Sequence, residues 1–289
     1  MKKIAIFALA LLTVAGASAQ ETEKKEFKPQ AGDWAVGVDM APVFKFVGNV
    51  FNGSTDNGLD KLGGSPSVRT FDIRPDVSLL GKYMITDNFG IRANIGLKIN
   101  THTDRAYVQD DAALLDNPLS EQKVIDAVRT ANHGGSILMG VEYRKGKRRV
   151  QGVFGGGILF AFSQNTTAYN YGNALTDVNQ RPSVSDPSGA YGRNGYRLLK
   201  DYSNSKDFYT GLTGSAGFEW MVAPKVAFGM EVNLSLYYVF GAQRYTQSEG
   251  FNPSTGEVEI RTDLVSPGNN EFYFGTESLG GSLYMCFYF

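Results

Sequence analysis

Cysteine, histidine and an excess of charge are what this sequence has least of. Its 289 residues include 1 cysteine and 2 histidines, and its formal net charge is −1. A single cysteine cannot form an internal disulfide or a thiolate zinc cluster, so Cys286 is expected to be a small buried residue. The nearly neutral charge argues against nucleic acid as a partner. Nothing in the composition indicates a cofactor or a metal site.

Long apolar runs are also missing, except at the start of the chain. Lys2 and Lys3 precede an apolar stretch over residues 4–15, and a tripeptide of small residues ends at Ala19. This is the pattern of a secretory signal peptide, which predicts a mature chain beginning at Gln20. No cysteine follows the apolar stretch, which excludes a lipid-anchored lipoprotein.

The signal peptide fixes the expected domain organisation. We expect a signal peptide over residues 1–19, a short periplasmic N-terminal tail over 20–32 and one barrel domain over 33–289. No later segment approaches the ~18 to 20 apolar residues that a membrane-spanning helix needs. A membrane location would therefore have to rest on strands.

Alternation of apolar and polar residues dominates the rest of the chain. Over residues 89–100 every odd position is apolar and every even position is polar or glycine. Successive side chains of a strand point to opposite faces, so such a segment has one apolar and one polar face. The same division predicts eight strands, near residues 34–46, 71–83, 89–100, 136–144, 150–162, 208–222, 226–240 and 272–289.

Side-chain size indicates which face points outward. Eight antiparallel strands enclose a lumen barely wide enough for side chains. The bulky apolar faces do not fit inside it, whereas the opposite faces, rich in glycine and serine, do. A barrel with an apolar exterior is insoluble in water but is stable in a lipid bilayer. The sequence therefore predicts an all-β fold, a transmembrane antiparallel β-barrel, and disfavours a soluble barrel of the lipocalin type.

The predicted links alternate between tight turns and long segments. The long links lie near residues 47–69, 101–134, 164–206 and 242–271. Short periplasmic turns and long extracellular loops are the rule for outer-membrane barrels, and an even strand count places both termini in the periplasm. The link over 164–206 is long enough to hide a further hairpin, so ten strands are an alternative. Residues 120–131 can form a short helix with Ser120 as its N-cap.

The last residues, SLYMCFYF, carry a family resemblance. Together with the alternation and the signal peptide, they resemble the small outer-membrane barrels of the OmpA, OmpX and OmpW kind, especially barrel-only, porin-like proteins of Bacteroidota. The resemblance covers essentially all of the mature chain. It implies an outer-membrane location, contact with lipid and lipopolysaccharide, and folding by the outer-membrane insertion machinery. The implied assembly signal consists of Leu283, Met285, Phe287 and Phe289.

The polar faces of the predicted strands place charges of both signs in the lumen. An uncompensated charge in so narrow a space is costly, so we expect these side chains to pair and plug the barrel. Arg92 and Glu142 are expected to be cross-strand neighbours, with Glu219 and Glu231 reaching toward the same cations. The alternative is a gate that opens a small-solute path when pairs exchange. The predicted network consists of Asp39, Lys82, Arg92, Lys98, Glu142, Arg144, Glu219 and Glu231.

Catalysis has little support in the sequence. His102 and His133 flank the second long link, but by strand parity they point to opposite faces. No motif of the barrel enzymes that modify lipid A or cleave proteins is visible, and such activity is a remote alternative. We expect a non-enzymatic protein with a structural or surface-interaction role, and a narrow channel for small molecules as the alternative.

The third long link is rich in tyrosine and arginine, which are enriched at binding hot spots. An extracellular contact is one interpretation of it, and a solvated, self-packed loop is the other. The residues that would make the contact are Tyr169, Tyr171, Tyr191, Arg193, Tyr196 and Arg197.

The signal peptide and the strand pattern together make a first prediction. The protein should fractionate with the outer membrane, start at Gln20 and migrate faster on gels when it is not heated, because a closed barrel resists detergent. Fractionation, N-terminal sequencing and a heating series check this. Recovery of a soluble periplasmic form with residues 1–19 attached contradicts the assignment.

Overall fold

The structure is a computed structural model that describes residues 27–39, 78–186 and 195–289. These residues contain ten strands and one short helix, Asp111–Asp116 (α3). The strands are Trp34–Asp39 (β1), Ser78–Thr86 (β2), Phe89–Gln109 (β3), Lys123–Lys147 (β4), Val150–Asn170 (β5), Arg197–Ala223 (β6), Val226–Gly241 (β7), Arg244–Asn252 (β8), Glu257–Ser266 (β9) and Asn270–Tyr288 (β10).

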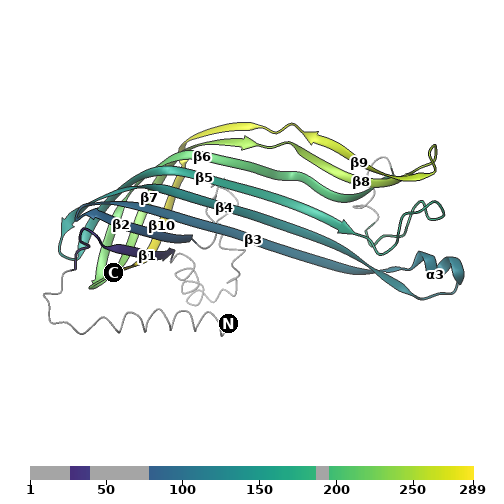
Figure 1. The fold of residues 1–289 in the computed structure, drawn as a ribbon, viewed down its shortest axis with the longest axis horizontal. Helices are drawn as coiled ribbons and strands as arrows, with labels where there is room; N and C mark the ends of the chain where they lie inside the picture. The colour runs from purple at the N-terminus through teal and green to yellow at the C-terminus, as the bar shows by residue number, and fades with distance from the viewer. Residues whose placement is uncertain (1–26, 40–77, 187–194) are drawn as a thin grey trace.

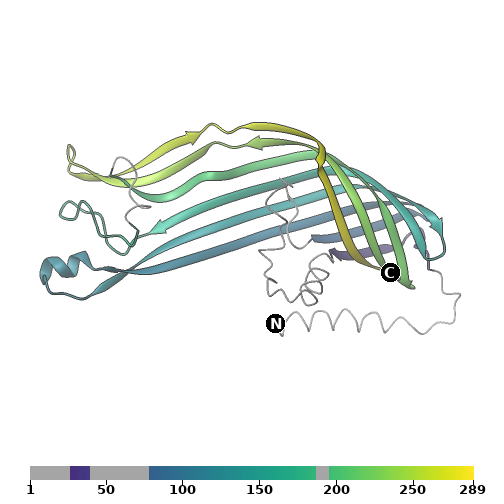
Figure 2. The ribbon, with the colours of Figure 1, turned by 180° about the vertical axis from the view of Figure 1, so that it is seen from behind.

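Eight of these strands form a closed ring. From β1 to β7 each strand pairs antiparallel with the next, and β10 pairs antiparallel with both β7 and β1. Figures 1 and 2 show the ring from opposite sides, with the short strands β1 and β2 near one end of the molecule. The predicted antiparallel barrel of eight strands is confirmed.

The two faces of the ring strands differ as the alternation predicts. On β3, Ile91 and Ile95 are exposed, whereas Arg92 and Gly96 are buried. A closed barrel with an apolar exterior and a polar interior is the architecture of a transmembrane barrel. Within the described residues, no helix has the length and apolar character needed to cross a bilayer. Other large apolar side chains exposed on the ring are Val141, Phe154, Ile158, Leu212, Phe218, Trp220, Met230 and Val232.

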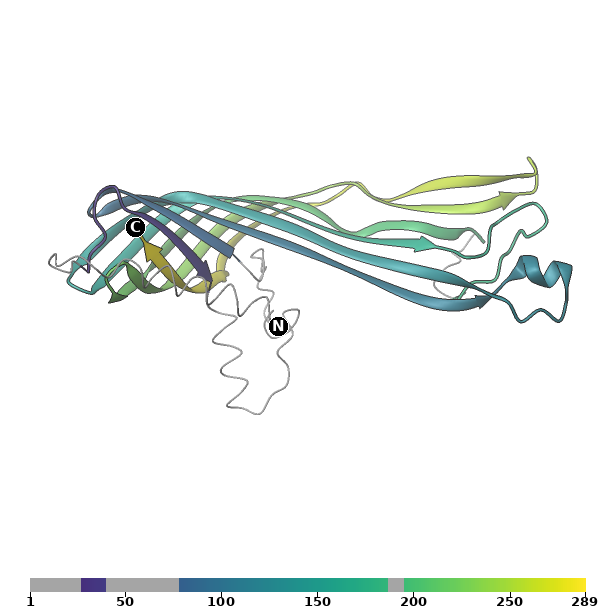
Figure 3. The same ribbon diagram turned by 60° about the horizontal axis from the view of Figure 1, so that its bottom comes forward.

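Four neighbouring strands continue well beyond the ring. β3, β4, β5 and β6 have 21, 25, 21 and 27 residues, whereas β7 has 16. Figure 3 shows them as an open, curved sheet that projects from the ring. We call this projecting sheet the extension. It comprises the parts of β3 to β6 beyond the cross-strand row Asn100, Asn132, Asn165 and Ser205, together with β8 and β9.

The interpretation of residues 101–134 as a loop containing a helix at 120–131 is wrong. β3 and β4 pair without a break from Phe89 opposite Tyr143 to Gln109 opposite Lys123. Much of this stretch of β4 also pairs with β5, so its backbone is hydrogen-bonded on both sides. A short helix, marginal on its own, cannot match that pairing. The helix lies at the hairpin tip instead, where the Asp110 side chain accepts hydrogen bonds from the first backbone N–H groups of α3.

The further hairpin lies in a different link from the one expected. β8 and β9 form it between β7 and β10, and β8 pairs with the Arg197–Asp201 part of β6. The chain therefore has ten described strands, eight of them in the ring. Residues 244–249, RYTQSE, are polar on both faces. They lack the alternation on which the strand prediction depends.

The turn end of the ring is packed and joined at a seam. The N–H groups of Trp34 and Phe289 each donate to the other residue's carbonyl, at 3.0 and 2.9 Å. Cys286 is fully buried there, as expected. Phe27 packs against the buried cluster at this end, and Pro29 is also buried. The cluster consists of Ala35, Leu80, Met221, Ala227, Tyr284, Cys286 and Tyr288.

Deleting Phe289 should impair assembly of the barrel. The deletion removes both backbone hydrogen bonds to Trp34 and the aromatic side chain that resembles the insertion signal. We expect less heat-modifiable protein in the outer-membrane fraction. Phe289→Ala, which keeps the backbone bonds, separates the two contributions. Wild-type levels of assembled protein after the deletion would refute the assembly role.

Candidate functional site

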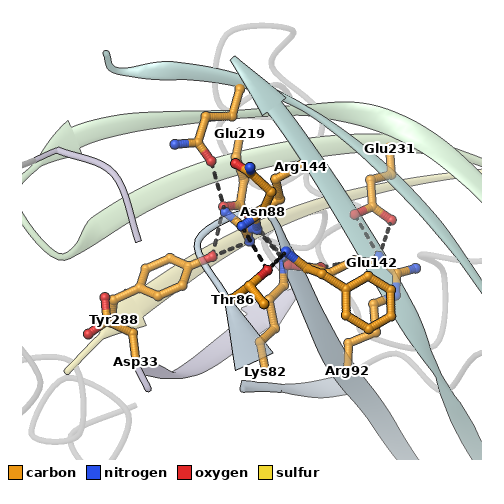
Figure 4. Close-up of polar contacts among 12 residues, drawn as sticks. Asp33, Lys82, Thr86, Asn88, Arg92, Glu142, Arg144, Glu219, Glu231 and Tyr288 are labelled. Carbon is orange, nitrogen blue, oxygen red and sulfur yellow. Dashed lines mark hydrogen bonds and ion pairs between the residues drawn. The ribbon is translucent and has the colours of Figure 1, made fainter. Parts of the chain in front are cut away.

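Six of the eight predicted lumen charges meet inside the turn half of the ring (Figure 4). They come from five strands, and none is more than 9% exposed. Three carry positive charge and three carry negative charge, so the group is neutral as a whole. We call it the ion cluster. Its members are Lys82, Arg92, Glu142, Arg144, Glu219 and Glu231.

Glu219 of β6 is the most highly connected carboxylate of the ion cluster. Its Oε1 lies 2.5 Å from Lys82 Nζ, and its two oxygens accept from Arg144 Nη1 and Nη2 at 2.7 and 3.1 Å. The hydroxyls of Tyr284 and Tyr288 donate to it at 3.0 and 2.8 Å. Five donor contacts surround one carboxylate, which is how a buried charge is compensated.

Glu142 of β4 holds the same two cations from the other side. Its Oε2 lies 3.1 Å from Lys82 Nζ, and its Oε1 accepts from Arg144 Nε at 2.6 Å. Lys82 and Arg144 are therefore each shared between Glu142 and Glu219. Two cations and two carboxylates in alternation make this lower layer of the ion cluster neutral.

Arg92 and Glu231 form the second layer of the ion cluster. Arg92 Nη1 contacts both oxygens of Glu231, at 2.8 and 2.9 Å, and Nη2 donates to Ser215 Oγ at 3.2 Å. The Tyr284 hydroxyl lies 2.9 Å from Glu231 and 3.0 Å from Glu219. Tyr284 therefore connects the two layers.

Arg92 and Glu142 lie on neighbouring strands, as expected, but they are not directly opposite each other. Arg92 lies opposite Lys82 on one side and Gly140 on the other, and Glu142 lies opposite Gly90. The two charged groups are diagonal neighbours, 4.0 Å apart. The long guanidinium spans the lumen to β7 and reaches Glu231, which was expected to approach it.

Glycines on the inner face provide the room that these long side chains occupy. A Cβ at Gly155 would come within 2.6 Å of Ser215 Oγ and 3.2 Å of Arg92 Cζ. A Cβ at Gly229 would come within 2.2 Å of the Tyr284 ring. The glycine-rich inner face is thus matched to the volume of the ion cluster.

Two predicted members do not join the ion cluster in the described structure. Lys98 is exposed on β3 and forms no ion pair with a described residue. It lies six residues beyond Arg92, roughly 20 Å along the strand. The side chain of Asp39 is outside the described residues, although its backbone pairs with Tyr284.

The sequence reasoning missed the uncharged members of the site. Tyr284 and Tyr288 are buried, and so are Gln151 and Met84 beside them on the inner face. A signal was present, because Tyr284, Cys286 and Tyr288 alternate with the outward residues of β10. Met285 and Phe287 are half-buried and Phe289 is 65% exposed, so the proposed assembly signal lies on the outer face. Leu283 shares that face.

The tyrosine- and arginine-rich link packs against the extension. Arg197 is buried, 2.7 Å from Glu249, and its guanidinium lies over the ring of Tyr171 at 4.3 Å. The Tyr171 hydroxyl donates to Leu198 O at 2.6 Å, and burial raises the pKa of Tyr171. Tyr169 and Tyr196 are half-buried. Tyr191 and Arg193 lie outside the described residues.

Hydrogen bonds to two aspartate side chains of the β3–β4 hairpin fix this link in place. Asp126 accepts from the N–H groups of Gly172 and Ser185 at 2.9 and 2.8 Å. Asp111 accepts from Ser183 N–H and Asn179 Nδ2, both at 2.8 Å. Partial burial acts to raise the pKa of Asp111, but these hydrogen bonds outweigh it and the pKa is lowered. The described part of the link is therefore an ordered cap on the extension.

The histidines lie far from the ion cluster. His102 Nε2 is 2.9 Å from Asp104 Oδ1, and both side chains are more than 70% exposed. His133 lies opposite Ile99 on the neighbouring strand, and the register places the two histidines on opposite faces. Among the described residues, no group of three or more His, Cys, Asp or Glu side chains is placed to hold a metal ion.

Comparison with protein families and with curated proteins finds no match to the sequence. Among solved structures the chain is similar to the outer membrane protein OprG from Pseudomonas aeruginosa. The two sequences are 12% identical, and the alignment covers 91% of this chain and 99% of that one with a TM-score of 0.28. The barrel fold of this chain rests on its own strand pairing.

Arg92→Ala should destabilise the barrel strongly. It leaves Glu231 buried without its guanidinium partner, which costs about 3 to 5 kcal/mol. Lys145→Ala, an exposed position on the same hairpin, is the control and should change the free energy of unfolding by less than about 0.5 kcal/mol. Urea unfolding in lipid, followed by the fluorescence of Trp34 and Trp220, measures both. Equal stability of the two variants would contradict the pairing described above.

Gly155→Ala should disturb the ion cluster, whereas Gly156→Ala should not. The added Cβ at Gly155 overlaps Ser215 and Arg92, while at Gly156 its nearest neighbour is Thr213 O at 3.7 Å. We expect Gly155→Ala to lower the free energy of unfolding by about 1 to 3 kcal/mol, as overpacking does. The same urea titration checks it, and a larger effect at Gly156 would be inconsistent with the inner-face assignment.

Proposed function

We propose that this chain is an integral outer-membrane β-barrel protein with a plugged lumen and a non-enzymatic role in the envelope or at the cell surface. The observation that carries the proposal is the ion cluster, six buried charges that balance and hydrogen-bond across the ring. A water-filled channel would leave such side chains hydrated. Here they fill the turn half of the lumen.

Two further features support a closed lumen. Below the ion cluster, toward the turns, lies the apolar cluster that includes Met221, Ala227 and Cys286. Residues 27–33 are attached to the turns at this end, where Gly32 N–H donates to Met84 O and Ala31 N–H to Asp87 Oδ1. A solute would have to pass both clusters.

The outer-membrane location is supported by the surface of the ring and by the N-terminal sequence. A closed barrel leaves no strand edge unpaired in lipid, and its exposed apolar side chains match a hydrocarbon environment. We propose that lipid and lipopolysaccharide contact this surface, that the insertion machinery assembles the barrel, and that both termini are periplasmic. The extension would then stand on the extracellular side.

A structural or surface role fits the extension better than transport does. More than half of β6 crosses the ring, and the rest of it, with β8, β9 and the ordered cap, forms a sheet outside. Such a surface can meet molecules or other cells while the lumen stays shut. No described group outside the ion cluster gathers the side chains of a hydrolytic or transfer reaction.

Conductance of the refolded protein in planar bilayers tests the plug. We expect the wild-type barrel to show no discrete current steps above the lipid background, because the ion cluster and the apolar cluster both fill the lumen. Regular steps from the wild-type protein would favour the alternative, a narrow channel for small molecules.

A further inference from the structure

The outermost strand of the extension has a free side. β9 pairs with β8 along its full length, and in the described structure it is the last strand of the sheet order. An unpaired strand edge presents a row of N–H and C=O groups, which can accept a further strand. β9 offers ten residues for this, Glu257–Ser266.

This edge lies outside the ring. β6 makes its last pair with β7 at Asp207, whereas it pairs with β8 through its more distant residues Arg197–Asp201. In Figures 1 and 2, β8 and β9 run along the long axis of the molecule, away from the C-terminus. The apolar side chains that β9 exposes therefore do not belong to the lipid-facing surface of the proposed membrane-spanning ring.

From Glu257 to Leu264, the apolar side chains of β9 share one face and the charged side chains share the other. Val258, Ile260 and Leu264 are 41, 69 and 68% exposed on the first face. Exposed apolar side chains grouped outside a membrane mark an interaction surface. On the other face Arg261 and Asp263 pair at 3.1 Å and are about half exposed. Charges of both signs on an edge permit pairing with a strand of matched pattern.

We propose that β9 is a homophilic docking edge, which pairs antiparallel with β9 of a second copy of this chain, centred on Thr262. In that register Arg261 of each copy lies opposite Asp263 of the other copy, and Ile260 of each copy lies opposite Leu264 of the other. Directly opposed pairs of unlike charge and of apolar residues stabilise an antiparallel sheet. The same surface serves both copies, as a two-fold interface requires.

Neighbouring registers that keep each face continuous are less favourable. Centring the pair on Arg261 places the two arginines opposite each other, and centring it on Asp263 does the same for the two aspartates. Centring it on Ile260 sets Glu257 against Asp263 twice, which offsets the two favourable Glu259–Arg261 pairs of that register. A parallel pairing in register would set every charge against itself. Opposed like charges destabilise strand pairing, so the sequence selects the Thr262-centred register.

The direction of β9 determines how the two barrels are placed. A two-fold axis through an antiparallel strand pair is perpendicular to the strands. Because β9 runs along the long axis of the molecule, the two rings end up at opposite ends of the pair. The docked copies therefore sit in two facing membranes. Each contact is small, but many copies on two surfaces act together, which raises the overall affinity.

Charge reversal in vesicles tests the proposal. Purified full-length protein is refolded into two vesicle populations with different dyes, and clustering is read as dye co-localisation and turbidity. Wild-type vesicles should cluster. Vesicles with Arg261→Glu, which opposes Glu to Asp263, should fall to the level of protein-free vesicles, and so should vesicles with Asp263→Lys, which opposes Lys to Arg261.

Mixing the two variants distinguishes strand pairing from general stickiness. Arg261→Glu vesicles and Asp263→Lys vesicles restore both opposed pairs when they meet, so the mixture should cluster like the wild type. Lys145→Ala is the control for an unrelated charge, and heat-modifiable migration shows that each variant is folded. Failure of the mixture to cluster would overturn the proposed register.

A symmetric crosslink locates the contact. Residues directly opposite in antiparallel strands have Cα atoms about 4.5 to 5.5 Å apart, within reach of a disulfide. Thr262→Cys adds a thiol to a chain whose own Cys286 is buried. Oxidation should join copies carrying different epitope tags in different vesicles. The proposal is overturned if no crosslinked dimer forms, which is the result expected when a segment of the same chain covers β9. It is also overturned if dimers form only between copies in the same vesicle.

Discussion

Backbone hydrogen bonding in lipid is the constraint on which the rest of this structure depends. Hydrocarbon offers no partner for an N–H or C=O group, so each strand that crosses it must give both edges to neighbours. The ring meets this demand through the seam between β1 and β10, where Trp34 and Phe289 exchange backbone hydrogen bonds. Beyond the ring, β3 to β6 continue as an open sheet.

Closure in turn fixes the chemistry of the interior. Eight strands leave little room, so the inner face consists of small residues wherever a long side chain has to fit. Gly155 and Gly229 lie beside Arg92 and Tyr284 in this way. The space they leave holds charges only because each is compensated by partners from other strands. Fold and plug are therefore consequences of the same narrow ring.

Much of the ring could be predicted from the sequence, because a strand with lipid on one side and the lumen on the other has alternating apolar and polar residues. The inward position of Arg92 and the outward position of Ile91 follow from parity alone. Parity also predicted the burial of Glu142 and Glu219. It could not tell which of the expected carboxylates holds Arg92 most closely, because a contact across the lumen depends on strand order, tilt and side-chain length together.

The extension escaped prediction for the opposite physical reason. It lies beyond the ring, where Arg244–Asn252 shows no alternation of apolar and polar residues, and where the alternating residues Glu257–Ser266 were assigned to a long link. The same absence made β4 around Val124 and Val128 look helical. Lys98 was also assigned to the lumen by parity, and among the described residues it is exposed and has no ion-pair partner.

The layered arrangement of the ion cluster also determines its response to an electric field. Lys82, Arg144, Glu142 and Glu219 sum to zero, and so do Arg92 and Glu231. An unpaired elementary charge gains about 2.3 kcal/mol on crossing a potential of roughly 100 mV. A layer without net charge experiences no net force from such a potential. A change of membrane potential therefore exerts no net force on either layer as a whole.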